Sequence, residues 1–164
     1  MYLRPFSYVA VETVSEAVKT LSEYGDEARV LAGGQSLLPL IGLGLARPRI
    51  LVDINGVDEL DGIRDEGESL YIGALVRYRT LERDPAVRQG IPVLAKAASL
   101  VGNIRVRSRG TVGGSLAHAD PAAELPCAVV ALGGEVDLCG PGGRRRVPAD
   151  EFFIGPLQTA LTEG

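Results

Sequence analysis

Glycine and proline punctuate this chain more densely than is usual in a globular protein. The sequence holds 21 glycines and 10 prolines among its 164 residues, about 19%, against roughly 12% in an average protein. No fixed period organises these residues, which excludes collagen, and their placement between apolar runs argues against a disordered tract. The backbone must therefore make many tight turns, and a backbone without side chains can approach a ligand closely.

Charge and composition exclude several classes of function. The formal net charge is −4, aromatic residues make up 5% of the chain, and tryptophan is absent. Nucleic-acid binding needs a basic surface and aromatic stacking platforms, and this sequence offers neither. The first residues lack the apolar core of a secretory signal, and the longest apolar stretch, residues 37–46, is too short to cross a bilayer. We therefore expect a soluble, cytoplasmic protein with no membrane span and no nucleic-acid partner.

Residues that ligate metals or act as nucleophiles are sparse. Cys127 and Cys139 have neither metal spacing nor a disulfide framework, and we expect each to be a small core residue. Two cysteines are also too few to hold an iron–sulfur cluster. His118 is the only histidine, so we expect no metal site and assign no catalytic residue.

The first fifty-odd residues predict a β-α-β unit. A helix is expected over 13–24, because Thr13 and Glu16 fit a capping box and a glycine follows as a stop. Residues 28–31 and 49–54 are typical of buried, parallel strands, with a helical stretch beginning at residue 37 between them. We place a first lobe at residues 1–55 and expect the leucines of residues 37–45 in its core.

Residues 56–164 predict a second lobe of α+β type. Its expected elements are a strand at 70–72, helical pieces over 80–101 broken at Pro85 and at 90–92, an alternating strand at 103–109, a glycine-rich turn at 110–115, a helix at 121–132, a strand at 135–138, a solvated hairpin around 140–146 and a short helix at 149–153. The apolar tail from Phe152 to Leu161 indicates a covering partner or a longer chain.

Two glycine-rich loops point to a ligand. Residues 32–36 (A-G-G-Q-S) lie between a predicted strand and a helix start, and residues 111–115 (T-V-G-G-S) have the same chemistry. Such loops turn backbone N–H groups toward one point, and Ser36 can cap the helix that follows. One loop of this kind is commonly an ordinary turn, but two suit a ligand with adjacent phosphates, such as a dinucleotide. Neither a P-loop nor a Rossmann fingerprint is present.

These segments resemble the FAD-binding medium subunit of molybdenum hydroxylases, the carbon monoxide dehydrogenase and xanthine dehydrogenase group. The resemblance rests on A-G-G-Q-S-L-L-P at 32–39, I-R-V-R-S-R-G-T-V-G-G-S-L-A-H-A-D-P-A-A-E-L-P at 104–126 and F-F-x-G at 152–155, in this order. It implies an α/β (α+β), two-lobed FAD-binding fold of the vanillyl-alcohol-oxidase-like (PCMH) type. Similar subunits carry a further C-terminal domain that this chain lacks, so we expect the FAD-binding portion of a longer subunit.

The resemblance also implies which residues hold FAD. The first loop would wrap the pyrophosphate with N–H groups, the second would hold its other side, and a carboxylate would accept hydroxyls of the ribityl chain. A branched side chain in the second loop, at Gly114, would then crowd the pyrophosphate. Asp120 is expected to cap the next helix instead. The implied cofactor-binding residues are Leu31, Ala32, Gly33, Gly34, Gln35, Ser36, Leu37, Thr111, Gly113, Gly114, Ser115, His118 and the carboxylate Glu124.

The function implied is that of an oxidoreductase subunit that transfers electrons. It would receive electrons from an iron–sulfur small subunit, in a complex with a molybdenum large subunit, and pass them to an external acceptor. Three alternatives stay open: a stand-alone flavoprotein of the same fold, a non-catalytic assembly fragment, and a nucleotide-binding module for a different anion. The sequence names neither the substrate nor the acceptor.

Overall fold

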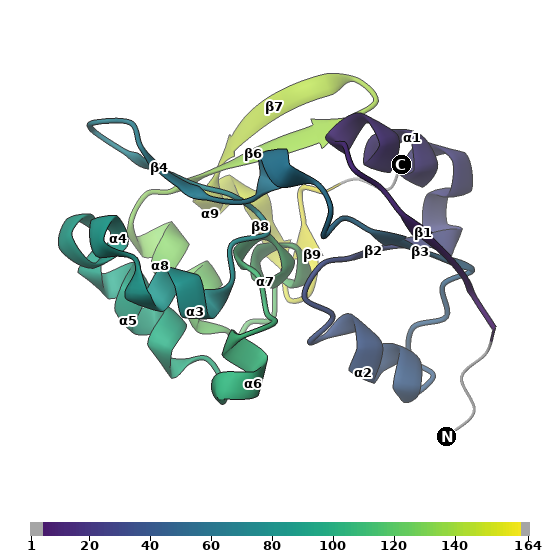
Figure 1. Ribbon diagram of the computed structural model, residues 1–164, viewed down its shortest axis with the longest axis horizontal. Helices are drawn as coiled ribbons and strands as arrows, with labels where there is room; N and C mark the ends of the chain where they lie inside the picture. The colour runs from purple at the N-terminus through teal and green to yellow at the C-terminus, as the bar shows by residue number, and fades with distance from the viewer. Residues whose placement is uncertain (1–4, 162–164) are drawn as a thin grey trace.

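A parallel three-stranded sheet forms the first part of the computed structural model, which describes residues 5–161 (Figure 1). Its strands are β1 (Ser7–Ala10), β3 (Ile50–Asp53) and β2 (Ala28–Leu31), in that spatial order. The central strand is buried because it is apolar on both faces. The parallel pair of β2 and β3 confirms the predicted β-α-β unit, whereas β1 was not predicted.

Helix α1 (Val14–Tyr24) covers this sheet and has the predicted ends. Glu16 N donates to Thr13 Oγ1 at 3.1 Å, and the chain leaves the helix at Gly25 with φ +48°. A short 3₁₀ turn, Gly25–Glu27, leads into β2, and a second one, Asp58–Leu60, follows β3. The capped start and the glycine stop are therefore confirmed.

Helix α2 (Leu37–Gly42) is present, but two expectations about it are wrong. The Ser36 side chain makes no capping hydrogen bond to the helix. Leu38, Leu43 and Leu45 are 48%, 73% and 73% exposed rather than in the core. The helix is six residues long and turns only Ile41 fully into the interior, so the leucines on its other sides stay on the surface.

The second part consists of short helices and three hairpins. The strands are β4 (Ile63–Asp65) with β5 (Leu70–Ile72), β6 (Glu135–Gly140) with β7 (Gly143–Pro148), and β8 (Phe153–Gly155) with β9 (Gln158–Thr159). The helices are α3 (Tyr78–Arg83), α4 (Pro85–Gly90), α5 (Pro92–Leu100), α6 (Ile104–Arg107), α7 (Val112–His118), α8 (Glu124–Ala131) and α9 (Ala149–Phe152). The predicted breaks before Pro85 and Pro92, and the arginine-bearing hairpin, are confirmed.

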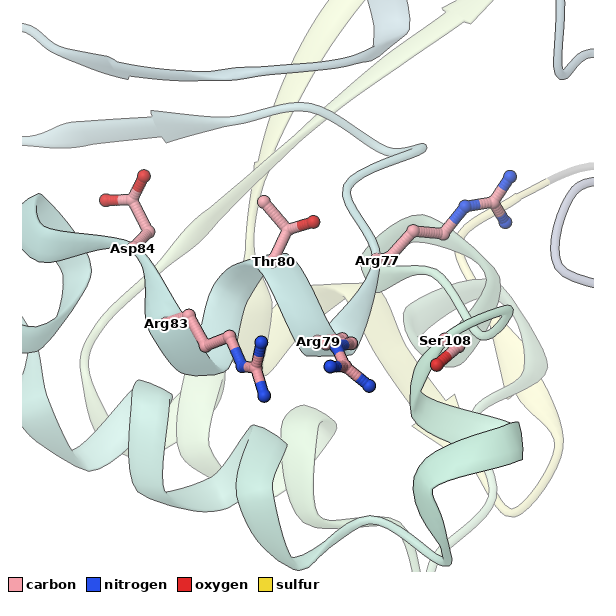
Figure 2. A pocket seen from close by; sticks show the side chains of 6 residues that line it. All are labelled: Arg77, Arg79, Thr80, Arg83, Asp84 and Ser108. Atoms are coloured by element: carbon pink, nitrogen blue, oxygen red, sulfur yellow. The ribbon is translucent and has the colours of Figure 1, made fainter.

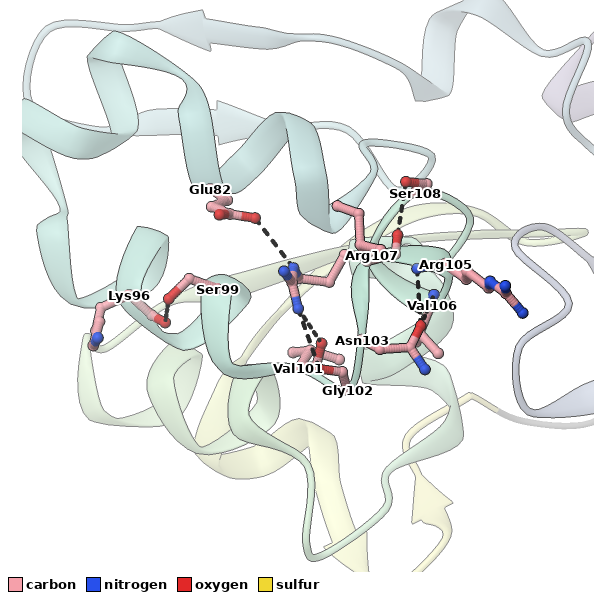
Figure 3. A network of polar contacts seen from close by, with 11 residues as sticks. Glu82, Lys96, Ser99, Val101, Gly102, Asn103, Arg105, Val106, Arg107 and Ser108 are labelled. Atoms are coloured by element: carbon pink, nitrogen blue, oxygen red, sulfur yellow. Dashed lines mark hydrogen bonds and ion pairs between the residues drawn. The ribbon is translucent and has the colours of Figure 1, made fainter.

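The segment 103–109, predicted as a strand, instead contains helix α6 at Ile104–Arg107. Asn103 Oδ1 accepts hydrogen bonds from the N–H groups of Arg105 and Val106, at 2.9 and 3.3 Å, and so caps the helix (Figure 3). Arg107 then reaches back to the carbonyl of Gly102 and to the carboxylate of Glu82, both within 3.2 Å. The alternation of apolar and basic residues was therefore misleading, because local capping outweighs it.

Other boundaries also differ from the predictions. The predicted glycine turn at 110–115 supplies the first residues of α7, and the helix expected from residue 121 begins at Glu124. Both cysteines are exposed and free, not in the core. Cys127 lies on the outer face of α8, and Cys139 points away from the core in β6, where the neighbouring Leu138 is buried.

Two hydrophobic cores support the fold. One joins the parallel sheet, α1 and the segment around Val57 and Leu75, and the other joins α3, α5, α7 and α8 around Leu81, Leu125 and Phe152. Figure 1 shows α7 between the sheet and the helices α3 to α5. None of the helices in residues 5–161 is long and apolar enough to cross a membrane.

Candidate functional site

The two glycine-rich loops meet in the middle of the molecule. The first loop (residues 32–36) leaves β2. The second loop, which in the structure begins at Arg109 and includes the predicted residues 111–115, leads from α6 into α7. A Cβ atom added to Gly33 would lie 2.3 Å from the carbonyl oxygen of Arg109 and 2.9 Å from Gly110 Cα. Only glycine allows the loops to approach so closely.

Two carbonyl groups of the first loop are held by hydrogen bonds from side chains of the protein. The Ala32 carbonyl accepts a hydrogen bond from Asn55 Nδ2 at 3.0 Å, and the Gly33 carbonyl accepts one from Gln35 Nε2 at 3.3 Å. In a trans peptide the carbonyl and the next N–H group point in opposite directions. The N–H groups that follow these carbonyls are therefore turned away from the protein partners.

These N–H groups are available to a ligand. Within residues 5–161, no acceptor takes the backbone N–H of Gly33, Gly34, Gln35 or Ser36. Gly34 has φ +69°, a left-handed conformation that helps successive N–H groups to converge. The first loop is thus built as a site for an anion.

The second loop differs from the first, although the two sequences look alike. Its N–H groups already have acceptors: those of Val112 and Gly113 donate to the carbonyls of Val76 and Ala74, and that of Gly114 donates to Thr111 Oγ1 at 3.2 Å. Thr111 is buried and caps α7. The second loop therefore presents its side chains, and a backbone wall at Arg109 and Gly110 that packs closely against the first loop, rather than N–H groups without acceptors.

The structure gives Gly114 a reason within the chain itself, and the crowding of the pyrophosphate stays a prediction. A Cβ atom there would lie 2.7 Å from Thr111 Oγ1, so the nearest obstacle is the helix cap itself. Similarly, a Cβ atom at Gly113 would lie 2.6 Å from the side chain of Ala74. Both glycines are required by packing within the chain.

Tyr78 joins two of the predicted site residues. Burial raises the pKa of its hydroxyl, the charge of Glu124 acts in the same direction, and a hydrogen bond with Ser115 opposes both effects. Ser115 and Glu124, from α7 and α8, are thus brought near one phenol. Tyr78 was not recognised from the sequence, because an aromatic residue at the start of a helix is typical of any core.

His118 and Asp120 flank an unusual backbone position. His118 is the last residue of α7, and Ala119 after it adopts φ +50° and accepts a hydrogen bond from the N–H of Leu157. Asp120 Oδ1 accepts a hydrogen bond from Ala122 N at 2.9 Å, in the turn before α8. Asp120 therefore caps that turn and not the helix. A contact between His118 and a cofactor stays a prediction.

An open pocket lies beside the second loop. It has a volume of about 430 Å³ and is lined by Arg77, Arg79, Thr80, Arg83, Asp84 and Ser108 (Figure 2). Its three arginines and single carboxylate make it cationic. Within residues 5–161 no group of three or more histidine, cysteine or acidic side chains gathers as a metal site would require.

The fold and the opposed loops define an α/β protein in which the first loop presents backbone N–H groups without acceptors in the described part of the chain. Residues 4–164 match the family model described as the FAD binding domain in molybdopterin dehydrogenase, so the chain belongs to this family. The predictions of the family and of FAD as its cofactor are confirmed at this level. The individual cofactor-binding residues stay predictions.

Known relatives agree with this assignment. The carbon monoxide dehydrogenase medium chain of Hydrogenophaga pseudoflava is 46% identical over 158 residues, which cover 96% of this chain and 55% of the relative. The caffeine dehydrogenase subunit beta of a Pseudomonas species is 39% identical, over 95% of this chain and 53% of the relative. The chain thus spans about half the length of the curated relatives it matches.

Solved structures give the same result. The chain superimposes with a TM-score of 0.97 and 45% identity on carbon monoxide dehydrogenase from Hydrogenophaga pseudoflava, over 99% of this chain and 56% of that one. Quinoline 2-oxidoreductase from Pseudomonas putida 86 gives a TM-score of 0.96 and 40% identity, with the same coverage of each chain.

Proposed function

We propose that this chain is the FAD-binding portion of an oxidoreductase subunit that transfers electrons in a molybdenum-containing dehydrogenase complex. Electrons would arrive from an iron–sulfur small subunit, beside a molybdenum large subunit, and leave to an external acceptor. The relatives named as medium chain and subunit beta support membership in a complex of several subunits. The single observation that carries the proposal is the row of four N–H groups in the first loop that find no acceptor within residues 5–161.

The chain's own residues would bind and orient the cofactor. The N–H groups of residues 33–36 would donate to the pyrophosphate oxygens, beside the backbone of Arg109 and Gly110 that packs against Gly33. Ser115 and Glu124 would hold hydroxyl groups of the ribityl chain, and His118 would line the site. FAD, when bound, supplies the redox chemistry, so no side chain here has to act as an acid or a base.

The division into lobes supports a site between them. We place lobe 1 at residues 1–55 and lobe 2 at 56–164, in a fold of the vanillyl-alcohol-oxidase-like (PCMH) type. The first loop would belong to lobe 1 and the second loop to lobe 2, although Val57 and Leu75 of lobe 2 also pack into the core of the parallel sheet. The cofactor would then bridge the lobes, which is a common location for a ligand site.

A titration with cofactor fragments tests the proposal. We expect the purified protein to bind FAD and ADP saturably, and to bind riboflavin much more weakly, because riboflavin lacks the pyrophosphate that the first loop would hold. Isothermal titration calorimetry measures all three, and the flavin absorption bands report FAD independently. A protein that ignores FAD would be a non-catalytic fragment, and one that binds ADP but not FAD would be a module for a different nucleotide. Either result contradicts the proposal.

A further inference from the structure

Asn55, two residues after the end of β3, holds the backbone of the first loop. Its Nδ2 donates to the Ala32 carbonyl at 3.0 Å and to Asp53 Oδ1 at 2.6 Å. Burial alone would raise the pKa of Asp53, but hydrogen bonds from Tyr8 and Asn55 outweigh this and lower it. Asn55 is therefore oriented by an ionised carboxylate at the end of the central strand.

Arg77 connects this amide to the second loop. Its Nη2 donates to Asn55 Oδ1 and its Nη1 donates to the Arg109 carbonyl, each at 2.5 Å. The Arg109 carbonyl is the atom that Gly33 approaches most closely. One planar guanidinium thus links the amide that fixes the first loop to the carbonyl that faces it from the second.

The link decides where the first loop's N–H groups point. The Ala32 carbonyl and the Gly33 N–H belong to one peptide plane, so fixing the carbonyl on Asn55 directs the N–H to the opposite side. A loop with two adjacent glycines has little steric resistance to a peptide flip. A flip would replace a donor by a carbonyl oxygen, which repels an anion.

We propose that Arg77 and Asn55 are positioning residues for the dinucleotide: they bridge the two loops and keep the N–H groups of the first loop directed at the ligand. This inference rests on the proposed function, because it assigns these residues to the same FAD site. Neither residue need touch the cofactor, since each acts through a backbone carbonyl.

Direct attraction between the Arg77 charge and a phosphate is the alternative explanation. Both terminal nitrogens of Arg77 are engaged by the protein, and its side chain points away from those of Arg79 and Arg83 (Figure 2). The geometry therefore favours a role of Arg77 in bridging the two loops over direct attraction of a phosphate. Lysine distinguishes the two explanations, because it keeps the charge but cannot form the planar fork.

The test compares FAD affinity in Arg77→Lys, Arg77→Gln and Asn55→Ala. We expect each to weaken FAD binding about tenfold or more, as the loss of charge-assisted hydrogen bonds would. Arg79→Gln is the matched control, because it removes the same charge two residues away, and we expect wild-type affinity. Calorimetric titration with FAD gives the affinities, and thermal unfolding without FAD shows whether each variant folds.

The outcomes separate this inference from the proposed function. The proposed bridge is supported if Arg77→Lys loses as much FAD affinity as Arg77→Gln. It is supported further if a double variant of Arg77 and Asn55 binds FAD no more weakly than either single variant. Near wild-type affinity in Arg77→Lys overturns it in favour of simple charge, as does unchanged affinity in Asn55→Ala. If Arg77 variants fail to fold, the folded Asn55→Ala protein decides. Wild-type protein that ignores FAD would overturn the proposed function, and this inference with it.

Discussion

Replacing Gly33 by valine is expected to abolish the retention of FAD. The new Cβ atom would lie 2.3 Å from the Arg109 carbonyl, and both obstacles on that side are backbone atoms that cannot rotate away. The two loops would have to separate by about 1 Å, which is enough to break the hydrogen bonds that the first loop would donate to the pyrophosphate. Titration with FAD measures this loss directly.

Gly140→Val is the matched control for that substitution. Gly140 ends β6, and an added Cβ atom would meet nothing within 4 Å. We expect wild-type FAD affinity in this variant. If valine at position 33 prevents folding, Gly33→Ala carries the same Cβ atom with less bulk. Wild-type affinity in a folded Gly33 variant would show that the loops do not enclose the pyrophosphate.

Phe152→Ala is expected to lower the free energy of unfolding by about 3–5 kcal/mol, a large part of the roughly 5–15 kcal/mol typical of a domain. The Phe152 side chain is 1% exposed in the core of the second part and packs edge-on against Phe153, with ring centroids 5.0 Å apart. Removing the ring would leave a cavity, because the neighbouring core side chains can relax into the space only in part. Urea denaturation followed by circular dichroism gives the change.

Ile154→Ala provides the comparison two residues further along. Ile154 is 67% exposed, so its truncation should change the free energy of unfolding by less than about 0.5 kcal/mol. Equal effects at positions 152 and 154 would contradict the placement of this segment, since the sequence alone shows both residues in one apolar run.

Local signals in the sequence were sufficient for much of the fold. Thr13 and Gly25 delimit α1 because capping and left-handed stops act within a few residues, and prolines divide the helical region at positions 85 and 92 for the same reason. The apolar segment 50–53 predicted a covered parallel strand, because only a strand buried on both faces can be uniformly apolar.

Several predictions of local structure and burial were wrong because contacts between residues far apart in the chain contribute to them. Arg107 binds Glu82, 25 residues earlier in the chain, and this contact adds to the local cap by Asn103 where the alternation indicated a strand. The leucines of 37–45 looked like core residues, but the short α2 presents only one side to the interior. The buried or exposed state of Cys127 likewise depends on which face of α8 packs, and the sequence does not show this.

The candidate site was predicted in part. Both glycine-rich loops were found, because glycine pairs between apolar segments are visible in the sequence. Their unequal roles were not, since two of the acceptors that engage the second loop are the carbonyls of Ala74 and Val76, far from it in the chain. Arg77, Asn55 and Tyr78 were missed because single polar or aromatic residues carry no motif.

Backbone amide NMR with FAD tests the central claim most directly. The claim is that the free N–H groups of residues 33–36 hold the pyrophosphate against the wall formed by residues 109–115. In a titration of ¹⁵N-labelled protein, we expect the largest shift changes at Gly33, Gly34, Gln35 and Ser36, with smaller ones across the second loop. Unmoved signals for these four residues at saturating FAD, or changes centred instead on Arg79 and Arg83, would contradict the account.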